Sequence, residues 1–137
     1  MPTTPLLEAE YRPTFSGHET FPLRYGWLQK AYDAVAEAGS GAEAVHVFRD
    51  QSSIARFGVG RNMVGSIRYW ATGTGVLKEA DEGLAPDWVG DLLFGRGGLD
   101  PYLEEDGSLW LLHWYLASRP KLTAFYWLFN DFSGGMF

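Results

Sequence analysis

Four polar side chains between residues 55 and 77 have the chemistry needed to recognise nucleic acid. Arg56, Arg61 and Arg68 are cations in a 137-residue chain whose formal net charge is −6, and Asn62 directly follows Arg61. Arg can donate two hydrogen bonds to guanine, Asn can pair with adenine in a similar bidentate way, and any Arg can neutralise a phosphate. These residue types predict contact with a polyanion. The alternative is that they form only the solvated face of a helical hairpin.

The charge is unevenly distributed along the sequence. Residues 49–78 hold five Lys or Arg against one Asp, a net +4, whereas residues 79–106 hold one Arg against nine Asp or Glu, a net −8. The overall acidity argues against general affinity for nucleic acid, but the local balance favours a basic patch on 49–78. The acidic segment is expected to be a solvated face or a docking surface for a basic partner protein.

Glycine and apolar spacing predicts that a helix-turn-helix positions these side chains. Asp50 is a suitable N-cap for a short first helix, whose inner face would carry Ile54 and Ala55. Gly58 would end that helix and adopt the positive φ of the tight turn. Val59 would then fill the gap between the two helices.

The second helix of the motif is predicted over residues 61–73, with Gly73 closing it. Val64, Ile67 and Trp70 recur at helical spacing and are expected to face the core. The following segment "VLKEADEGLAP", residues 76–86, has an apolar run, an acidic turn and a second apolar run, which is typical of a two-stranded wing. The prediction is a winged helix-turn-helix, in which the second helix enters the DNA major groove.

The expected DNA-binding residues are those that this arrangement leaves facing outward or on the wing. Arg61 and Asn62 are expected to read bases, small residues to permit close approach, and the other cations to bind phosphate. The acidic wing tip argues against deep insertion of the wing. The full set is Arg56, Gly60, Arg61, Asn62, Gly65, Ser66, Arg68, Tyr69, Thr72 and Lys78.

The rest of the sequence predicts a mostly α-helical protein with additional aromatic-rich helices. Residues 1–15 are expected to be an extended N-terminal arm, because their three prolines oppose helix formation. A helix is predicted from Pro22 to Gly39, and residues 45–48 ("VHVF") are expected to form a strand or lead into a helix. Three further helices are predicted, over 87–94, 107–119 and 121–132.

The two C-terminal helices carry an aromatic stripe that is expected to lie in the core or in a covered domain interface. Its members are Trp110, Trp114, Phe125, Tyr126, Trp127 and Phe129. Because the last residues of the chain are apolar, we expect residues 16–137 to be the N-terminal, winged-helix domain of a longer protein.

Other kinds of chemistry have weaker sequence support. The chain has no Cys, and its three His residues share no metal-ligand spacing, so no metal site is predicted. His113 is expected to be a buried structural residue, whereas His18 and Glu19 form an alternative acid/base pair. Without a signal peptide or a long apolar stretch, the protein is expected to be cytoplasmic and to have no membrane partner.

Four segments together resemble a known bacterial family. They are "FSGHETFPLRYGWLQKAYDAV", "ARFGVGRNMVGSIRYWATGTGVL", "DPYLEEDGSLWLLHWYL" and "AFYWLFNDF", which fall within residues 14–132. The chain is similar to a domain-of-unknown-function family whose members accompany cysteine desulfurases and other sulfur-transfer proteins. The resemblance implies the DNA-nicking B component of Ssp-type DNA phosphorothioation systems, in which sulfur replaces a non-bridging phosphate oxygen.

The resemblance implies a DNA-binding module of an anti-phage defence system, with duplex DNA and the other components of a sulfur-modification complex as partners. It also implies that nicking belongs to the full-length protein, with Mg²⁺ or Mn²⁺ as the cofactor, and it identifies no catalytic residue. Two alternatives remain. The domain itself could be a metal-dependent DNA nickase, or it could be a winged-helix interaction module for sulfur-transfer partners.

Overall fold

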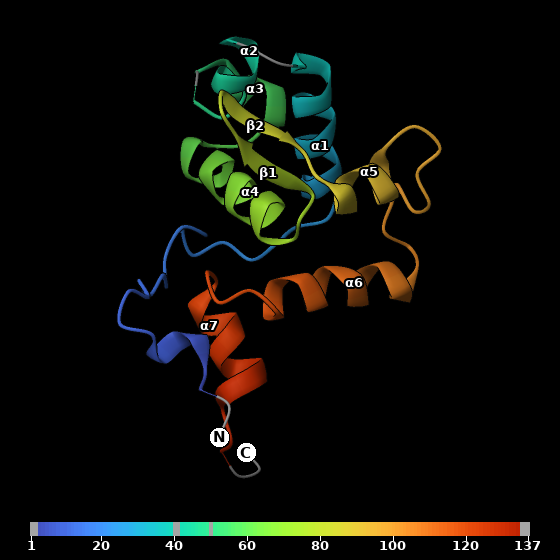
Figure 1. Cartoon of the computed structure of the whole chain (residues 1–137). Coiled ribbons are helices and arrows are strands. Elements are labelled where there is room, and N and C mark those ends of the chain that lie inside the picture. Colours follow the sequence, from blue (N-terminus) through green and yellow to red (C-terminus); the bar gives the residue numbers. More distant parts are fainter. Residues whose placement is uncertain (1–2, 40–41, 50, 135–137) are drawn as a thin grey trace.

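The computed structural model describes residues 3–39, 42–49 and 51–134, and it is mostly helical with one small sheet (Figure 1). The first four α-helices and the sheet form one body, and α6, α7 and the N-terminal arm lie on one side of it. In chain order the elements are η1 (Pro5–Leu7), α1 (Trp27–Ala38), α2 (Ala42–His46), α3 (Ser52–Phe57), α4 (Arg61–Gly73), β1 (Leu77–Ala80), β2 (Gly83–Pro86), α5 (Trp88–Phe94), α6 (Asp106–Ala117), α7 (Thr123–Tyr126) and the π-helical turn η2 (Trp127–Asp131).

Helices α3 and α4 are joined by the tight turn that the sequence predicts. Gly58 has φ 66° and ψ 29°, and its N–H donates to the Ile54 carbonyl at 2.9 Å. This left-handed conformation is the one in which glycine avoids the steric cost of a Cβ. Helix α4 then begins at Arg61 and ends at Gly73, which confirms both predicted bounds.

The predicted hairpin after α4 is also present. Strands β1 and β2 pair antiparallel, with Leu77 opposite Pro86 and Ala80 opposite Gly83. Gly83 has φ 86°, and a Cβ there would lie 2.6 Å from the Ala44 carbonyl oxygen. Glycine is therefore required at this position both for the turn and for the close approach of α2.

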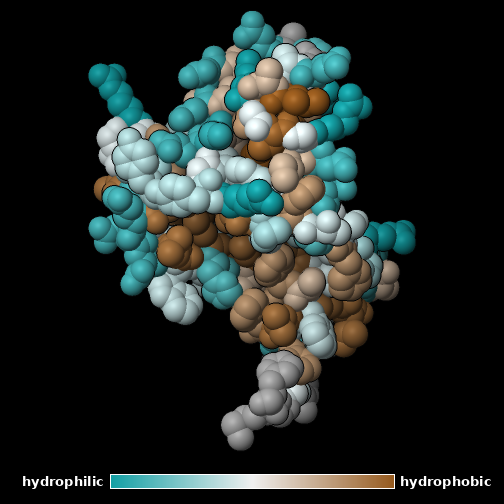
Figure 2. All heavy atoms as spheres, turned by 180° about the vertical axis from the view of Figure 1, so that it is seen from behind, coloured by the Kyte–Doolittle hydropathy of each residue, from teal (hydrophilic) through white to brown (hydrophobic). Residues whose placement is uncertain are grey.

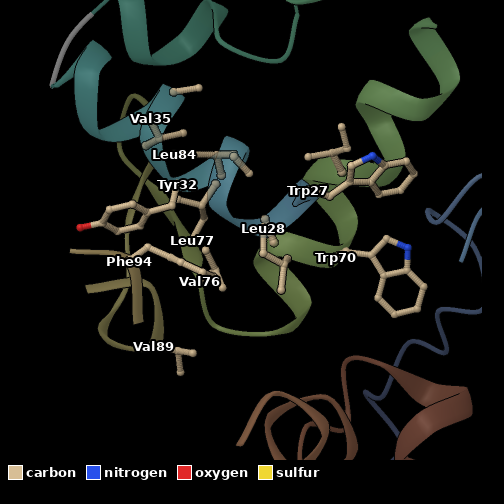
Figure 3. Close-up of a cluster of buried hydrophobic side chains, with 14 of the residues drawn as sticks. Trp27, Leu28, Tyr32, Val35, Trp70, Val76, Leu77, Leu84, Val89 and Phe94 are labelled. Carbon is tan, nitrogen blue, oxygen red and sulfur yellow. The ribbon is translucent and has the colours of Figure 1, made fainter. Parts of the chain in front are cut away.

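The core lies between α1, α4, the hairpin and α5 (Figure 3). Val64, Ile67 and Trp70 of α4 are buried, as their spacing predicts, and Trp70 donates its indole N–H to the Phe21 carbonyl at 3.0 Å. Burial of these apolar side chains is the main stabilising term for helices this short. The remaining core side chains that Figure 3 labels are Trp27, Leu28, Tyr32, Val35, Val76, Leu77, Leu84, Val89 and Phe94.

Three predictions on the first half of the chain need correction. Helix α1 ends at Ala38 with Gly39 as its C-cap, in line with the prediction, but it begins at Trp27 and not at Pro22, because Gly26 at its N-cap has a left-handed φ of 81°. Residues 45–48 form no strand: α2 covers them up to His46, and a turn follows. Asp50 lies outside the described residues, and Gln51 is the N-cap of α3.

The inner face of α3 also differs from the prediction. Ser53 and Phe57 are buried, Ile54 is half-buried, and Ala55 is exposed. Phe57 stacks on Phe48 with ring centroids 5.0 Å apart, which turns the Ser53–Phe57 side of the helix inward. Ala55 is two residues from each of them and therefore points away from the core.

The N-terminal arm lies beside α7 in Figure 1 and is bonded to it. The Tyr11 hydroxyl donates to the Pro120 carbonyl at 2.6 Å, and the Thr14 N–H donates to the Thr123 hydroxyl at 2.7 Å. Apart from the short η1 turn, the described part of the arm contains no helix or strand. The arm thus ties the first residues of the chain to the connection between α6 and α7.

The C-terminal aromatic stripe is largely outside the core. The exposed fractions are 70% for Trp110, 58% for Trp114, 47% for Trp127 and 52% for Phe129. Figure 2 shows hydrophobic side chains gathered over the lower part of the molecule, where α6 and α7 lie. Helix α6 carries large apolar side chains on several sides, so burying Leu112 and Leu116 against the core leaves the others exposed.

Within the described ranges, every helix is too short or too polar to cross a lipid bilayer.

Candidate nucleic-acid interface

One side of α4 carries four of the ten predicted DNA-binding residues. Arg61, Gly65, Arg68 and Thr72 are spaced by four, three and four residues, so they follow one side of the helix. Arg61 is exposed, as is the adjacent Asn62, while the other three are half-buried. The periodicity of α4 therefore places Arg61, Gly65, Arg68 and Thr72 along one side of the helix.

Ser66 is not part of this surface, in contrast to the prediction. Its exposed fraction is 0%, and its hydroxyl oxygen has no hydrogen-bond partner. A helix turns by about 100° per residue, so position 66 is rotated from Gly65 toward the side that also carries Trp70 and Gly73. Ser66 is a buried residue of the core, and its small size matters for packing.

Tyr69 and Thr72 are already engaged within the fold. The Tyr69 ring lies 5.6 Å from the His18 ring and 5.3 Å from that of Trp70, and burial raises its pKa. The Thr72 hydroxyl donates to the Arg68 carbonyl at 3.0 Å. Both residues retain partial exposure, but their main contacts are structural.

The N-terminal end of α4 is suited to an anion. Its N-cap is Gly60, which has no side chain to bond the first backbone amides of the helix. Those amides and the helix dipole favour negative charge, and Arg61 and Asn62 flank them. A shallow groove beside this end is also lined by Arg49, Glu19 and Gly65.

Arg49 links this groove to the middle of α4. It also lines a neighbouring depression with Arg68, Glu79 and Asp81, between α2, α4 and the hairpin. In that depression Arg68 forms an ion pair with Glu79, with Nη2 at 3.0 Å from Oε1, and both side chains are partly exposed. We name Arg49, Arg61, Asn62, Gly65 and Arg68 the α4 surface.

Arg56 lies apart from the α4 surface. It lines a separate depression together with Glu43, His46 and Ser52, on the side of α2 and α3. Neither the groove lined by Arg61 nor the depression lined by Arg68 includes Arg56. The structure therefore does not group Arg56 with Arg61 and Arg68.

Lys78 lies at the other end of α4 and lines a larger cleft. The cleft is formed by the arm, the end of α4, β1 and the connection between α6 and α7. Arg119 and Lys121 also line it, although sequence reasoning did not predict them. They are about forty residues beyond Lys78, and only their charge in an otherwise apolar segment could have indicated a role.

The possible acid/base pair lies beside the α4 surface but has a structural environment. His18 packs against the rings of Tyr69 and Trp70, with centroids 5.6 and 6.5 Å apart, in a turn closed by a hydrogen bond to its carbonyl. Glu19 follows with a positive φ of 51°, a conformation that is uncommon for this residue. Among the described residues, no three His, Asp or Glu side chains gather in a group that could hold a metal ion.

Comparisons with known proteins find solved structures that are similar to this chain. Two solved structures are similar, each with a TM-score of 0.64: a magnesium ion-bound SspB, 39% identical, and a second SspB structure, 38% identical. In both cases the match covers 77% of this chain but only 31% and 32% of the SspB chain, so this chain spans about a third of their length.

The family comparison covers more of the chain. No curated protein matches this sequence. The protein family of unknown function DUF4007 matches residues 15–137. The chain therefore belongs to the DUF4007 family, which confirms the Ssp-related family expected from the sequence.

Proposed function

We propose that this chain is a DNA-binding module of an Ssp-type DNA phosphorothioation system and that it contacts duplex DNA through the α4 surface. The observation that carries the proposal is that Arg61 and Arg68 lie on one side of α4 and that Arg49, from the turn after α2, lines the grooves beside both of them, in a chain whose net charge is −6. A strongly acidic protein repels DNA overall, so binding requires such a local concentration of cations. The similarity to SspB supports the assignment to this system.

The residues of the α4 surface would contact different parts of the duplex, according to their positions. Arg61 and Asn62, at the N-terminal end of α4, would reach base edges in the major groove. Arg49 and Arg68, on either side, would hold backbone phosphates, and the half-buried Gly65 would let the duplex approach closely. The β1–β2 hairpin would act as a wing that carries Lys78.

The module would place a nicking and sulfur-insertion complex on its DNA. We propose that the other components of the system bind it, and that nicking with Mg²⁺ or Mn²⁺ belongs to the full-length protein. No residue of this chain is assigned a catalytic role. Its contribution would be to hold the duplex in register for chemistry performed elsewhere.

Fluorescence anisotropy with labelled duplexes tests the proposal. Replacing Arg61 with Gln should cost about 1–3 kcal/mol of binding free energy, and it should relax base preference if Arg61 reads a base. Arg68→Gln should lower the affinity for all duplexes by the same factor. It should also reduce the slope of log affinity against log salt concentration by the contribution of about one phosphate. Arg96→Gln is the matched control, because Arg96 is exposed in the loop after α5. Equal affinity of the Arg61→Gln/Arg68→Gln double variant and the control would contradict the proposal.

Two further measurements separate the alternative functions. Supercoiled plasmid incubated with the chain and Mg²⁺ or Mn²⁺ should stay supercoiled; open-circle product would make the domain itself a nickase. In a pull-down, the chain should capture the other Ssp components through its protein surface, without any need for DNA. Partner binding without any DNA affinity would favour an interaction module that uses the exposed carboxylates Glu79, Asp81 and Glu82.

A further inference from the structure

We infer that the cleft between the arm, β1 and the α6–α7 connection is a second phosphate site, which takes a backbone phosphate of the same duplex. The inference rests on the proposed function and extends its footprint to residues far away in the sequence. The cleft has a volume of about 330 Å³. We name it the rear cleft, and its polar lining consists of Thr14, Ser16, Tyr69, Thr72, Lys78, Glu79, Arg119 and Lys121.

Three cations from two distant segments line the rear cleft. Lys78 extends from β1, while Arg119 and Lys121 belong to the connection that follows α6. Glu79 also lines the cleft, but its carboxylate forms an ion pair with Arg68, which lines the neighbouring depression. The Arg68 Nη2 lies 3.0 Å from the Glu79 Oε1. The cleft therefore carries a positive excess that an anion would neutralise.

Arg119 is held in place before any ligand arrives. Its Nη1 donates to the Thr72 carbonyl at 3.0 Å, and its guanidinium carbon lies 4.3 Å from the centroid of the Tyr115 ring. A guanidinium has five N–H donors, so bonding one carbonyl leaves donors for a phosphate. Fixing the side chain in advance lowers the entropy lost on binding.

Hydroxyl groups complete a phosphate-binding environment. Ser16 and Thr14 contribute hydroxyls from the arm, and Tyr69 contributes its phenol from α4. A tyrosine phenol is protonated at neutral pH and can donate a hydrogen bond, and burial raises the pKa of Tyr69 further. Cations with neutral donors are the combination that recognises phosphate oxygens on a DNA backbone.

The rear cleft is positioned so that one duplex would contact both it and the α4 surface. The α4 surface begins at Arg61, the first residue of α4, and the rear cleft is lined by Thr72 and Gly73, the last two. Thirteen helical residues span about 20 Å at 1.5 Å each. With base pairs about 3.4 Å apart, this corresponds to about six base-pair steps, roughly half a turn of DNA.

Substitution of Lys121 tests the inference in the same anisotropy titration. Lys121 is exposed, so Lys121→Gln removes one charge without disturbing the core. We expect a several-fold loss of affinity that is equal for random and candidate-site duplexes. The slope of log affinity against log salt concentration should fall by the contribution of about one phosphate. Lys121→Arg should retain binding, and Lys30→Gln, at an exposed position on α1, should leave it unchanged.

The outcomes separate this inference from the proposed function. If Arg61→Gln weakens binding but Lys121→Gln matches Lys30→Gln, the rear cleft is overturned and the α4 surface stands. If the wild-type chain binds no duplex, titration with inorganic phosphate tests the site directly, followed through the backbone amide signals of Arg119 and residues 121–123. Shifts that Lys121→Gln removes would keep an anion site but overturn its nucleic-acid ligand, and the absence of shifts would overturn the site.

Discussion

Gly65 is a residue at which fold and proposed function make opposite demands. A Cβ there would lie 3.8 Å from the Glu19 Cγ, an ordinary contact, so Gly65→Ala fits the structure. The change should stabilise α4 by about 0.5–1 kcal/mol, because alanine loses less backbone entropy than glycine. It should also weaken duplex binding, since the methyl group would hold the DNA away from the helix. Thermal unfolding and anisotropy on the same variant measure the two effects.

Gly75→Ala is the contrasting control. Gly75 has φ 74°, and a Cβ would lie 2.5 Å from the Tyr115 ring. This substitution should lower the free energy of unfolding by more than about 1 kcal/mol. Duplex affinity that is unchanged in Gly65→Ala would contradict close approach of DNA at Gly65.

Glu79 limits how freely Arg68 can reach a phosphate. Their ion pair is exposed, so Glu79→Gln should change the free energy of unfolding by no more than about 1 kcal/mol. Duplex affinity should rise several-fold at low salt, because the change releases Arg68 and removes a negative charge. Glu82→Gln removes the same charge from the hairpin tip without touching Arg68. Equal gains in the two variants would show that only the overall charge matters.

At the scale of elements, Tyr32 joins α1 to α5. Its hydroxyl donates to the Asp91 carboxylate at 2.7 Å, and burial, followed by this hydrogen bond, raises the pKa of Tyr32 to about 12 from 10.0. The neutral phenol is favoured in the fold, so its stabilisation is full below pH 10 and lost as pH rises through 12. Urea unfolding between pH 9 and about pH 12 should therefore show a falling stability.

The Tyr32→Phe variant provides the comparison. It lacks the titrating phenol and the bond to Asp91, so it should be less stable near pH 8 by about 1 kcal/mol and should lose less on the alkaline side. Some alkaline loss should remain, because the pKa of Tyr69 is also raised by burial. Identical pH profiles for the two proteins would contradict the assignment of the loss to Tyr32.

Some secondary-structure elements can be predicted from local sequence patterns. The bounds of α4, the Gly58 turn and the hairpin were predictable, since each depends on residues a few positions apart. Which side of a short helix faces the core could not be predicted in the same way. The predictions for Ala55 and Ser66 are wrong, because small side chains carry no signal of their own about which side of a helix is buried. Phe48 stacking on Phe57 turns Ala55 outward, and Ser66 is fully buried.

At the scale of the whole molecule, the N-terminal arm holds the α6–α7 connection. Tyr11→Phe removes the hydroxyl that donates to the Pro120 carbonyl and bonds the Thr123 hydroxyl. The variant should lose about 1–2 kcal/mol of unfolding free energy. Faster hydrogen exchange of the α7 amides, with α4 unchanged, should accompany it. Uniformly faster exchange in both helices would instead mean that the arm supports the whole fold.

The helical class, the turn, the hairpin and the basic character of 49–78 are predictable from the sequence, because helical periodicity, glycine conformation and charge are local properties. The sequence also indicated the family, which the match over residues 15–137 confirms. Which cations lie together depends instead on tertiary packing. Arg49, Arg119 and Lys121 reach the surfaces around α4 because packing of α2, the arm and α6 brings distant segments to one helix, and no local pattern records such contacts.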